Sequence, residues 1–297
     1  MIRLCRPEQW IKNVIVLAAV VFGFKMGQAA SWLKALTAVA AFCLMSSASY
    51  VFNDIFDIHS DRTHPKKKLR PLAAGQVGIK EAGAMTIALV LAGTAAAYGL
   101  GALFYIVLIA YFALHVGYTL VFKKQVLIDV ICIALGFVLR AVGGAVAIRV
   151  EVSPWLIICT FMLCLFMGFC KRYSETVFVG PSELEKHRVT LIRYTPGLLN
   201  HLITFSATLA VVSFLLYAIN ERTVEHFGTM YMVYLVPLVV YGVFRFAMLS
   251  MEGAYTDPTE LILKDRPFQF TVALWGVGAL SIILWGRDIQ QWAAAQF

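Results

Sequence analysis

Long apolar segments alternate with short polar segments along almost all of the 297 residues. A helix of about 20 apolar residues crosses the hydrocarbon core of a bilayer, and each of these segments is close to that length. We predict nine membrane spans, at residues 10–26, 31–52, 81–99, 102–122, 126–148, 153–170, 200–219, 229–249 and 268–286. The pattern therefore predicts an all-α, polytopic membrane protein.

The composition agrees with a chain that is surrounded mainly by lipid. Hydrophobic residues make up 60% and charged residues 14%, whereas soluble domains contain about 25% charged residues. Mean hydropathy is +0.78. These values exclude a two-domain cytosolic enzyme, a disordered chain and a small disulfide scaffold. The six cysteines form no CxxC pair, so we expect neither disulfides nor zinc. We expect membrane lipid as a partner and no nucleic acid.

The positive charges are distributed unevenly. Of the 25 Lys and Arg residues, eighteen lie in the N-terminal segment and in the loops after the second, fourth, sixth and eighth spans. Positive charge marks the cytoplasmic side, so we predict a plasma (inner) membrane protein with a cytoplasmic N-terminus. The first apolar segment lacks a small-residue cleavage site, and we expect it to be retained. Part of the net charge of +8 then only orients the chain.

Acidic residues gather on the same predicted side, at the end of the second span. If the helix continues past the membrane boundary, Asp54, Asp57 and Asp61 share one face, and Asn53 lies one turn from Asp57. Like charges at this spacing repel, so something positive must stabilise them. Mg²⁺ commonly takes one or two carboxylates together with phosphate oxygens of a substrate. We predict metal ligands at Asp54, Asp57 and Asp61; the alternative is a solvated acidic helix end matched to nearby lysines.

A basic run follows immediately, as Lys66-Lys67-Lys68 and then Arg70. Pro65 is expected to stop the helix, which leaves the run in a loop of about 28 residues, longer than a simple connector. Lysine and arginine side chains bind phosphate, so Lys66 and Arg70 are predicted to neutralise phosphate oxygens beside the metal. Lys67 and Lys68 could equally contact anionic lipid headgroups.

The fourth and fifth spans supply a third group. Tyr118 and Lys123 lie at the predicted cytoplasmic end of the fourth span, and Asp129 opens the fifth. Asp129 and Arg140 are eleven residues apart, so both face the same way about 16 Å apart on a straight helix. A charge deep in a span usually faces a polar cavity or a partner. This face is predicted to line a cavity, in which Arg140 holds either a phosphate or a structural carboxylate.

The motif Asn53-Asp54-x-x-Asp57-x-x-x-Asp61 resembles the first aspartate-rich motif of the UbiA superfamily of intramembrane prenyltransferases. The resemblance implies an all-α, nine-helix bundle around a central cavity open to the cytoplasmic face, and Mg²⁺ that holds a diphosphate. It also implies a single domain over residues 1–297, in which the loops 53–80, 123–129, 171–199 and 250–267 form a cytoplasmic cap over the active site.

Further motifs are similar to one subgroup, the decaprenyl-phosphate phosphoribosyltransferases. They are the opening run from Arg6-Pro7 to Asn13-Val14, the run from Asp61-Arg62 to Arg70-Pro71, Tyr118 with Lys123 and Asp129, Leu139-Arg140-Ala141, Lys171-Arg172-Tyr173-x-Glu175, and Asp265-Arg266. With the aspartate motif, the resemblance implies catalytic roles for Asp54, Asp57, Asp61 and Lys123. It implies substrate-binding roles for Asn53, Arg62, Lys66, Arg70, Tyr118, Asp129, Arg140, Lys171, Arg172, Tyr173 and Glu175.

Lys171 and Arg172 stand where other superfamily members have a second aspartate-rich motif. A cationic pair binds phosphate directly rather than Mg²⁺, although the two residues could also be anchors at the inner membrane face. One metal-diphosphate site and one basic phosphate site imply two anionic substrates. The resemblance therefore predicts Mg²⁺-dependent transfer of a phosphoribosyl group from phosphoribosyl diphosphate (PRPP) to a polyprenyl phosphate, in cell envelope biosynthesis. A homo-oligomer is left open.

Two other functions stay open at this point. A conventional superfamily prenyltransferase would use a prenyl diphosphate donor and an aromatic or lipid acceptor, and it would need a functional acidic pair near Glu175. A multi-pass transporter or lipid-binding protein would use the inner-face charges for translocation. Against the second, the charges gather at one membrane face and not at the midplane.

Overall fold

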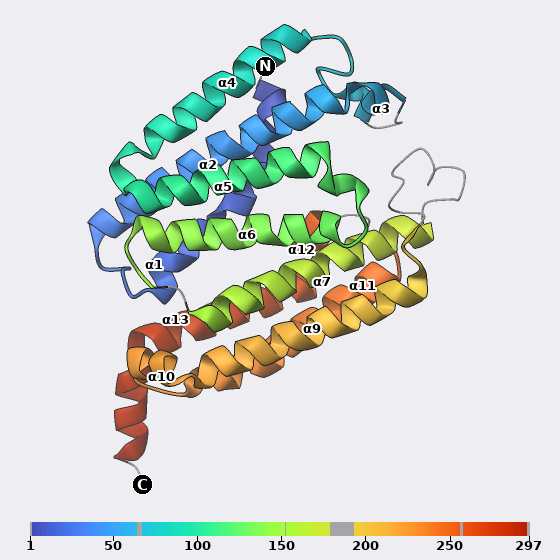
Figure 1. Ribbon diagram of the computed structural model, residues 1–297. Helices are drawn as coiled ribbons and strands as arrows, with labels where there is room; N and C mark the ends of the chain where they lie inside the picture. The colour runs from blue at the N-terminus through green and yellow to red at the C-terminus, as the bar shows by residue number, and fades with distance from the viewer. Residues whose placement is uncertain (1, 64–66, 152, 179–192, 256–257, 296–297) are drawn as a thin grey trace. The chain divides into compact units, whose positions relative to one another are not determined.

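The computed structural model describes residues 2–63, 67–151, 153–178, 193–255 and 258–295. Within these ranges the chain is helical and contains no strand (Figure 1). Eight of the described helical segments are long and apolar enough to cross a membrane: Ala29–Phe56, Ile79–Leu100, Ala102–Leu120, Ile128–Ala147, Pro154–Phe178, Pro196–Ile219, Tyr231–Met251 and Arg266–Trp292. We predicted one domain over 1–297; the contacts divide the chain into two compact units, which meet near residue 152 in the sequence, and each is described by itself.

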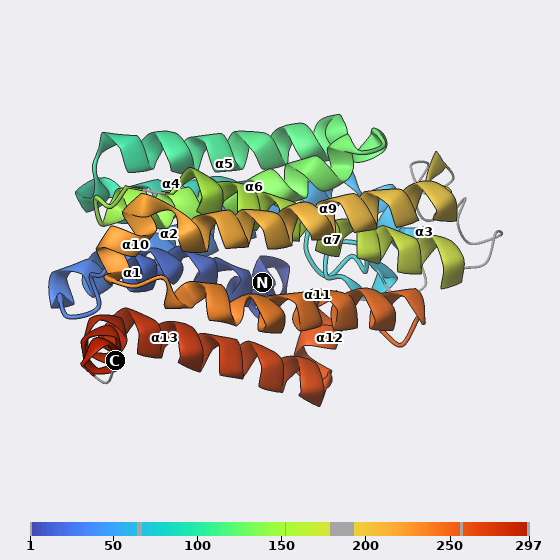
Figure 2. The same cartoon turned by 90° about the horizontal axis from the view of Figure 1, so that it is seen from below.

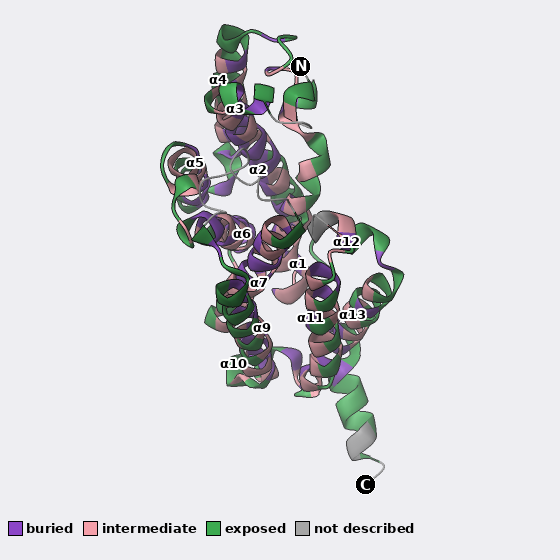
Figure 3. Ribbon diagram, turned by 90° about the vertical axis from the view of Figure 1, so that its right-hand side faces the viewer, coloured by how far each residue is buried: buried purple, intermediate pink, exposed green. Residues whose placement is uncertain are grey.

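The first unit is built around α2 (Ala29–Phe56), against which α4 (Ile79–Ala96), α5 (Ala102–Leu120) and α6 (Ile128–Ala147) pack. Helix α2 buries a larger share of its length than the other long helices, as the purple residues in Figure 3 show. Phe42 of α2 packs edge-on against Phe104 and Tyr111 of α5, with ring centroids 5.8 and 5.3 Å apart. The short helices of this unit are α3 (Ile58–Thr63), η3 (Lys67–Leu69), η4 (Tyr98–Leu100) and η5 (Phe122–Lys124).

The N-terminal segment differs from the predicted first span. Residues 10–26 were predicted as one span, but the chain forms η1 (Ile2–Cys5), a 3₁₀ helix η2 (Pro7–Leu17) and a short α1 (Ala18–Phe22). Because a 3₁₀ helix rises about 2.0 Å per residue, η2 and α1 together extend about 30 Å, which is the thickness of the hydrocarbon core. The span at residues 10–26 therefore stays a prediction, with fewer residues than an α-helix would need.

Glycine lets this N-terminal segment lie close to α6. A Cβ atom on Gly144 would lie 2.2 Å from the carbonyl oxygen of Val16, so no larger residue fits there without moving η2. Val16 is fully buried in the same core as Phe42, Phe104 and Tyr111. The segment is thereby fixed against both α2 and α6.

The second unit contains α7 (Pro154–Phe178), α9 (Pro196–Ile219), α10 (Glu221–Phe227), η7 (Tyr231–Leu235), α11 (Val236–Met251), α12 (Pro258–Lys264) and α13 (Arg266–Ala294). Helices α7 and α9 pack along their length, and α11 packs against α7, α9 and α13; Figure 2 shows α11 beside α13. Phe246 of α11 lies between Phe166 of α7 and Phe268 of α13, with ring centroids 5.5 and 6.0 Å away. Aromatic packing therefore joins three helices of this unit.

The fold confirms the predicted all-α membrane class, and eight predicted spans each overlap one observed long helix. Helix α2 continues to Phe56, four residues past the predicted end of the second span. The backbone breaks at Asp57 (φ −92°, ψ 3°) and then continues as α3. The N–H of Asp57 donates to Asn53 O at 2.9 Å and that of Asp61 to Asp57 O at 2.8 Å, so the helical spacing of the acidic residues survives the break.

Candidate active site

Two of the three aspartates at the end of α2 are buried and share a guanidinium group. Asp54 and Asp61 are each 2% exposed. Nη1 of Arg70 lies 3.1 Å from Oδ1 of Asp54 and 2.5 Å from Oδ2 of Asp61. Arg6, which lies between η1 and η2, also donates to Oδ1 of Asp54. Burial without these cations would strongly disfavour the ionised carboxylates.

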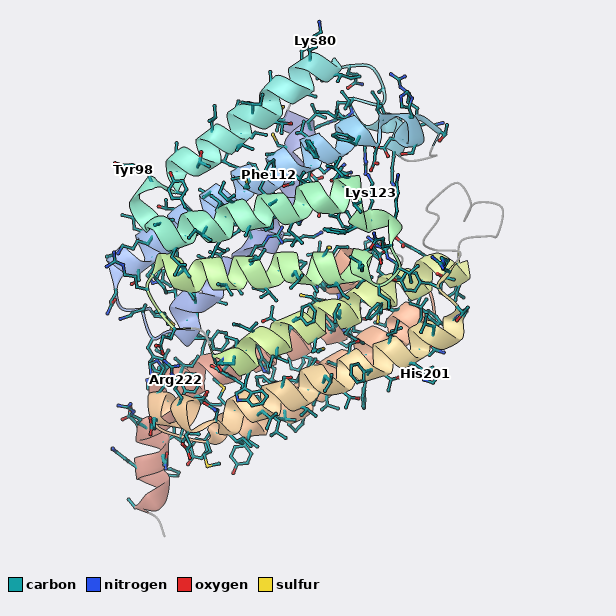
Figure 4. The ribbon with its side chains drawn as sticks, in the orientation of Figure 1. Lys80, Tyr98, Phe112, Lys123, His201 and Arg222 are labelled. Carbon is teal, nitrogen blue, oxygen red and sulfur yellow. The ribbon has the colours of Figure 1, made fainter. Side chains whose placement is uncertain are left out.

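The third aspartate is held by α5 and η5. Nζ of Lys123 lies 2.5 Å from Oδ1 of Asp57; Lys123 lies just beyond the end of α5 in Figure 4. The Asn53 amide donates to Oδ2 of Asp57 at 3.0 Å, and the Thr119 hydroxyl donates to Asn53 Oδ1 at 3.2 Å. Thr119 and Lys123 are four residues apart and therefore orient the Asn53–Asp57 pair from one side.

The cluster has as many positive as negative side chains. Arg6, Arg70 and Lys123 face Asp54, Asp57 and Asp61. The burial of Asp54 and Asp61 argues against a solvated helix end at these two residues. Asn53, Arg70 and Lys123 contact the aspartates, and their roles in binding and catalysis stay predictions. Sequence reasoning did not assign a site role to Arg6 or Thr119.

The aspartates at the end of α2 can bind Mg²⁺ only if other ligands complete its coordination shell. Among the described residues, no group of three His, Cys, Asp or Glu side chains is arranged to enclose a metal ion. The hydrogen bonds to Asp54 and Asp61 use one carboxylate oxygen of each, which leaves a second hard oxygen on both. Mg²⁺ typically takes one or two carboxylates and completes its shell with water and phosphate oxygens. The residues therefore fit an ion that arrives with a phosphorylated ligand, not a closed protein cage.

Arg140 is fixed by neutral partners inside the first unit. Its Nε donates to Asn13 Oδ1 at 2.7 Å, Nη2 to the Tyr111 hydroxyl at 2.6 Å and Nη1 to Gly136 O at 3.1 Å. The guanidinium also lies 4.7 Å from the centroid of the Tyr111 ring. Among the described residues, these hydrogen-bond partners of Arg140 include no carboxylate. A phosphate at Arg140 stays a prediction.

The remaining predicted residues of the first unit differ in burial. Asp129 is fully buried at the start of α6, and Tyr118 is half-buried near the end of α5. Arg62 is exposed on α3. Lys66 lies outside the described residues, so its predicted role is not addressed by the structure. The roles of these four side chains in binding stay predictions.

The predicted cationic pair belongs to the second unit. Arg172 is 3% exposed and its Nη1 donates to Glu175, one turn further along α7. Lys171, Tyr173 and Glu175 are half-buried, and the Ser174 hydroxyl donates to Ser250 O at 2.9 Å. The motif therefore contains its own acidic partner, and its net charge is smaller than that of the Lys171-Arg172 pair alone.

An ion pair between α11 and the last predicted loop fixes the start of α13. Arg245 donates to Asp265 through Nε and Nη2, at 2.6 and 2.8 Å, and the Phe268 N–H donates to Asp265 at 2.8 Å. Hydrogen bonding from Arg245 holds the pKa of Asp265 below its usual range. Asp265 therefore acts as a helix cap and a link to α11.

Comparison with known proteins identifies the family. Residues 14–248 match the UbiA prenyltransferase family. A protein named decaprenyl-phosphate phosphoribosyltransferase from Mycolicibacterium smegmatis is 33% identical over 286 residues, covering 93% of this chain and 89% of that protein. The protein of the same name from Corynebacterium glutamicum is also 33% identical and covers 93% of this chain and 84% of its own length.

A solved structure agrees at the level of the fold. The UbiA homolog from Archaeoglobus fulgidus bound to GPP and Mg²⁺ superposes with a TM-score of 0.74 at 22% identity, over 95% of this chain and 98% of that one. The fold, the acidic motif at the end of α2 and the length of the family match lead to one conclusion. This chain belongs to the UbiA prenyltransferase family.

Proposed function

We propose that this protein transfers a 5-phosphoribosyl group from PRPP to a polyprenyl phosphate of the decaprenyl type and releases diphosphate. One observation carries the choice of donor and acceptor: relatives with 33% identity over 93% of the chain bear the name decaprenyl-phosphate phosphoribosyltransferase. The motif Lys171-Arg172-Tyr173-Ser174-Glu175 supports it, because a motif with net positive charge suits an anionic acceptor better than a second Mg²⁺.

The donor binds, in this proposal, at the end of α2. Asp54, Asp57 and Asp61 would provide oxygen ligands for Mg²⁺, and Arg70 and Lys123 would bind phosphate oxygens of the donor. Mg²⁺, when bound, supplies positive charge that stabilises diphosphate as a leaving group. Asn53 and Thr119 keep Asp57 oriented through the hydrogen bonds at 3.0 and 3.2 Å. The arrangement supports binding of a diphosphate of either a sugar or a prenyl donor.

The transfer step makes one bond and breaks one bond. The bond between ribose C1 and the diphosphate oxygen breaks, and diphosphate leaves with the electron pair while C1 gains positive charge. A phosphate oxygen of the acceptor forms the new bond to C1 from the opposite face, with inversion. Because this nucleophile is already an anion, the step needs no strong general base. We assign Lys171 and Arg172 to hold the acceptor phosphate, with Glu175 keeping Arg172 extended.

The substrates also require a particular location. PRPP is water-soluble and the acceptor is a lipid, so the site must be reached from the cytoplasm while the lipid tail stays in the membrane. The distribution of Lys and Arg supports a cytoplasmic N-terminus. With a membrane span at residues 10–26, the end of α2 would then lie on the cytoplasmic side as well.

The test is a choice between two labelled donors. Purified protein is incubated with polyprenyl phosphate and Mg²⁺, together with labelled PRPP or with labelled prenyl diphosphate. We expect label to enter the lipid from PRPP, to be lost when EDTA removes the metal and to be lost in Asp54→Asn. Label that enters only from prenyl diphosphate would refute the proposal and favour a conventional superfamily prenyltransferase.

A further inference from the structure

Arg6 has a backbone conformation that arginine rarely adopts. Its φ of 49° and ψ of 61° lie in the left-handed region, where residues other than glycine are uncommon. The next residue is Pro7, and a proline further restricts the residue before it to extended conformations. Such strained residues persist only where the surrounding structure holds them, and they cluster at functional sites. The surroundings of Arg6 therefore need an explanation.

Residues on both sides of Arg6 are fixed by contacts with α2. On one side, Leu4 is fully buried against Val51, and the Ser47 hydroxyl donates to Cys5 O at 2.9 Å. On the other side, the Trp10 indole N–H donates to Ser47 Oγ at 3.0 Å.

One turn further along η2, Asn13 is fully buried. Its amide donates to Cys43 Sγ at 3.2 Å, and Oδ1 of Asn13 accepts from Arg140 Nε at 2.7 Å. These contacts hold η2 against both α2 and α6. The N-terminal segment is thus fixed on both sides of Arg6, which restricts where the Arg6 side chain can lie.

The Arg6 side chain reaches the buried oxygen Oδ1 of Asp54. Arg6 donates to it through Nη2, and Arg70 Nη1 lies 3.1 Å from the same oxygen. The Arg6 guanidinium also lies 5.1 Å from the centroid of the Tyr50 ring, which supports it independently of Asp54. Two guanidinium groups on one oxygen repel each other, and the Arg6 side chain is 20% exposed. Arg6 is therefore partly accessible to a ligand, although it is bonded to Asp54.

We propose that Arg6 is a diphosphate-binding residue of the donor site. When a diphosphate binds, Asp54 would hold its metal ion, and the Arg6 guanidinium would leave Oδ1 of Asp54 and donate to a phosphate oxygen. Arginine suits this exchange, because its planar fork binds phosphate oxygens and carboxylates with the same geometry. The proposal rests on the proposed function only in requiring a donor that ends in a diphosphate.

If Arg6 moves from Asp54 to the diphosphate, Arg6→Ala should change the affinities for metal and for diphosphate in opposite directions. Without Arg6, one competitor for Asp54 is gone, so we expect Mn²⁺ alone, followed by electron paramagnetic resonance, to bind several-fold more tightly. Inorganic diphosphate in the presence of Mg²⁺, followed by calorimetry, loses a charge-assisted contact, and we expect about tenfold weaker binding. Arg3→Ala is the matched control, because Arg3 is an exposed arginine of the same segment, and neither affinity should change.

The possible results separate a binding role from a structural one. A diphosphate affinity equal to that of Arg3→Ala would overturn the proposal, and so would a loss of both affinities together, which indicates general disruption of the site. If Arg6→Ala does not fold, Arg6→Lys replaces it. The lysine keeps the charge beside Asp54 but not the fork, so weaker diphosphate binding with unchanged Mn²⁺ binding supports the proposal, and wild-type values for both overturn it.

The experiment also keeps this inference separate from the choice of donor. If the labelled-donor assay shows transfer only from prenyl diphosphate, the proposed function fails. The diphosphate titration still decides the role of Arg6, since both donors end in the same group.

Discussion

Gly144→Ala is the substitution whose effect follows most directly from the geometry. The added Cβ would lie 2.2 Å from the carbonyl oxygen of Val16, 2.9 Å from its carbonyl carbon and 3.0 Å from its Cα. All three are backbone atoms, so no change of rotamer relieves the contact. Helix η2 must move away from α6 by about 1 Å to restore normal van der Waals distances.

Two opposing contributions set the size of the effect. Overpacking of this kind costs about 1–3 kcal/mol, and the better helix propensity of alanine returns at most about 1 kcal/mol. We therefore expect a net loss of stability of roughly 1–2 kcal/mol. A shift of η2 also lengthens the 2.7 Å hydrogen bond from Arg140 to Asn13 and draws Arg6 away from Asp54.

The assay pairs unfolding with ligand binding. Gly144→Ala should unfold at a lower temperature than wild type in the same detergent and should bind inorganic diphosphate with Mg²⁺ more weakly. Gly83→Ala in α4 is the control, because nothing lies within 4 Å of a Cβ there, and it should unfold at the wild-type temperature or slightly above. If Gly144→Ala is as stable as Gly83→Ala, the close approach of η2 is wrong. If it is destabilised but binds diphosphate normally, η2 does not position the donor site.

Three further substitutions have defined outcomes. Asp57→Asn removes a proposed metal ligand, so turnover with PRPP should fall about a hundredfold or more; near-normal turnover would remove Asp57 from the metal site. Lys123→Met removes a charge-assisted contact, typically about 1.5–3 kcal/mol, and should raise the KM for PRPP about tenfold or more; an unchanged KM would contradict its role. Arg245 lowers the pKa of Asp265 below its ordinary value of 3.8. The ion pair therefore stabilises the fold above pH 3.8, and this stabilisation is lost as the pH falls through the lowered pKa. Asp265→Asn should therefore unfold at a temperature that changes less between about pH 6 and about pH 3 than that of wild type; an equal change would show that another group causes it.

Local sequence patterns were sufficient to predict most of the helices. Hydrophobic length alone indicated eight of the long helices, because a bilayer requires about the same number of apolar residues in every span. The segment at 10–26 differs from its prediction, since composition does not distinguish a 3₁₀ helix from an α-helix. The type of helix changes the rise per residue and therefore the number of residues that a span needs.

The spacing of the aspartates was also a local property. Steps of three and four residues place Asp54, Asp57 and Asp61 on one side of any continuous helix, and the backbone hydrogen bonds preserve that spacing through the break at Asp57. Their partners were only partly predictable. Arg70 and Lys123 carry charge in nearby predicted loops, but Thr119 has no signal beyond its position one turn before Lys123.

The amino-acid pattern is enough to predict the membrane class, the helical fold and an acidic and a basic group at one predicted face. Which of these charges meet depends on how the helices pack. Arg6 is 48 residues from Asp54, and Arg140 is 127 residues from Asn13. Contacts over such separations depend on how η2 packs between α2 and α6, and a sequence pattern along one helix contains no information about that packing. Burial gives these contacts their energetic importance, because removing a charged carboxylate from water costs free energy that paired cations offset.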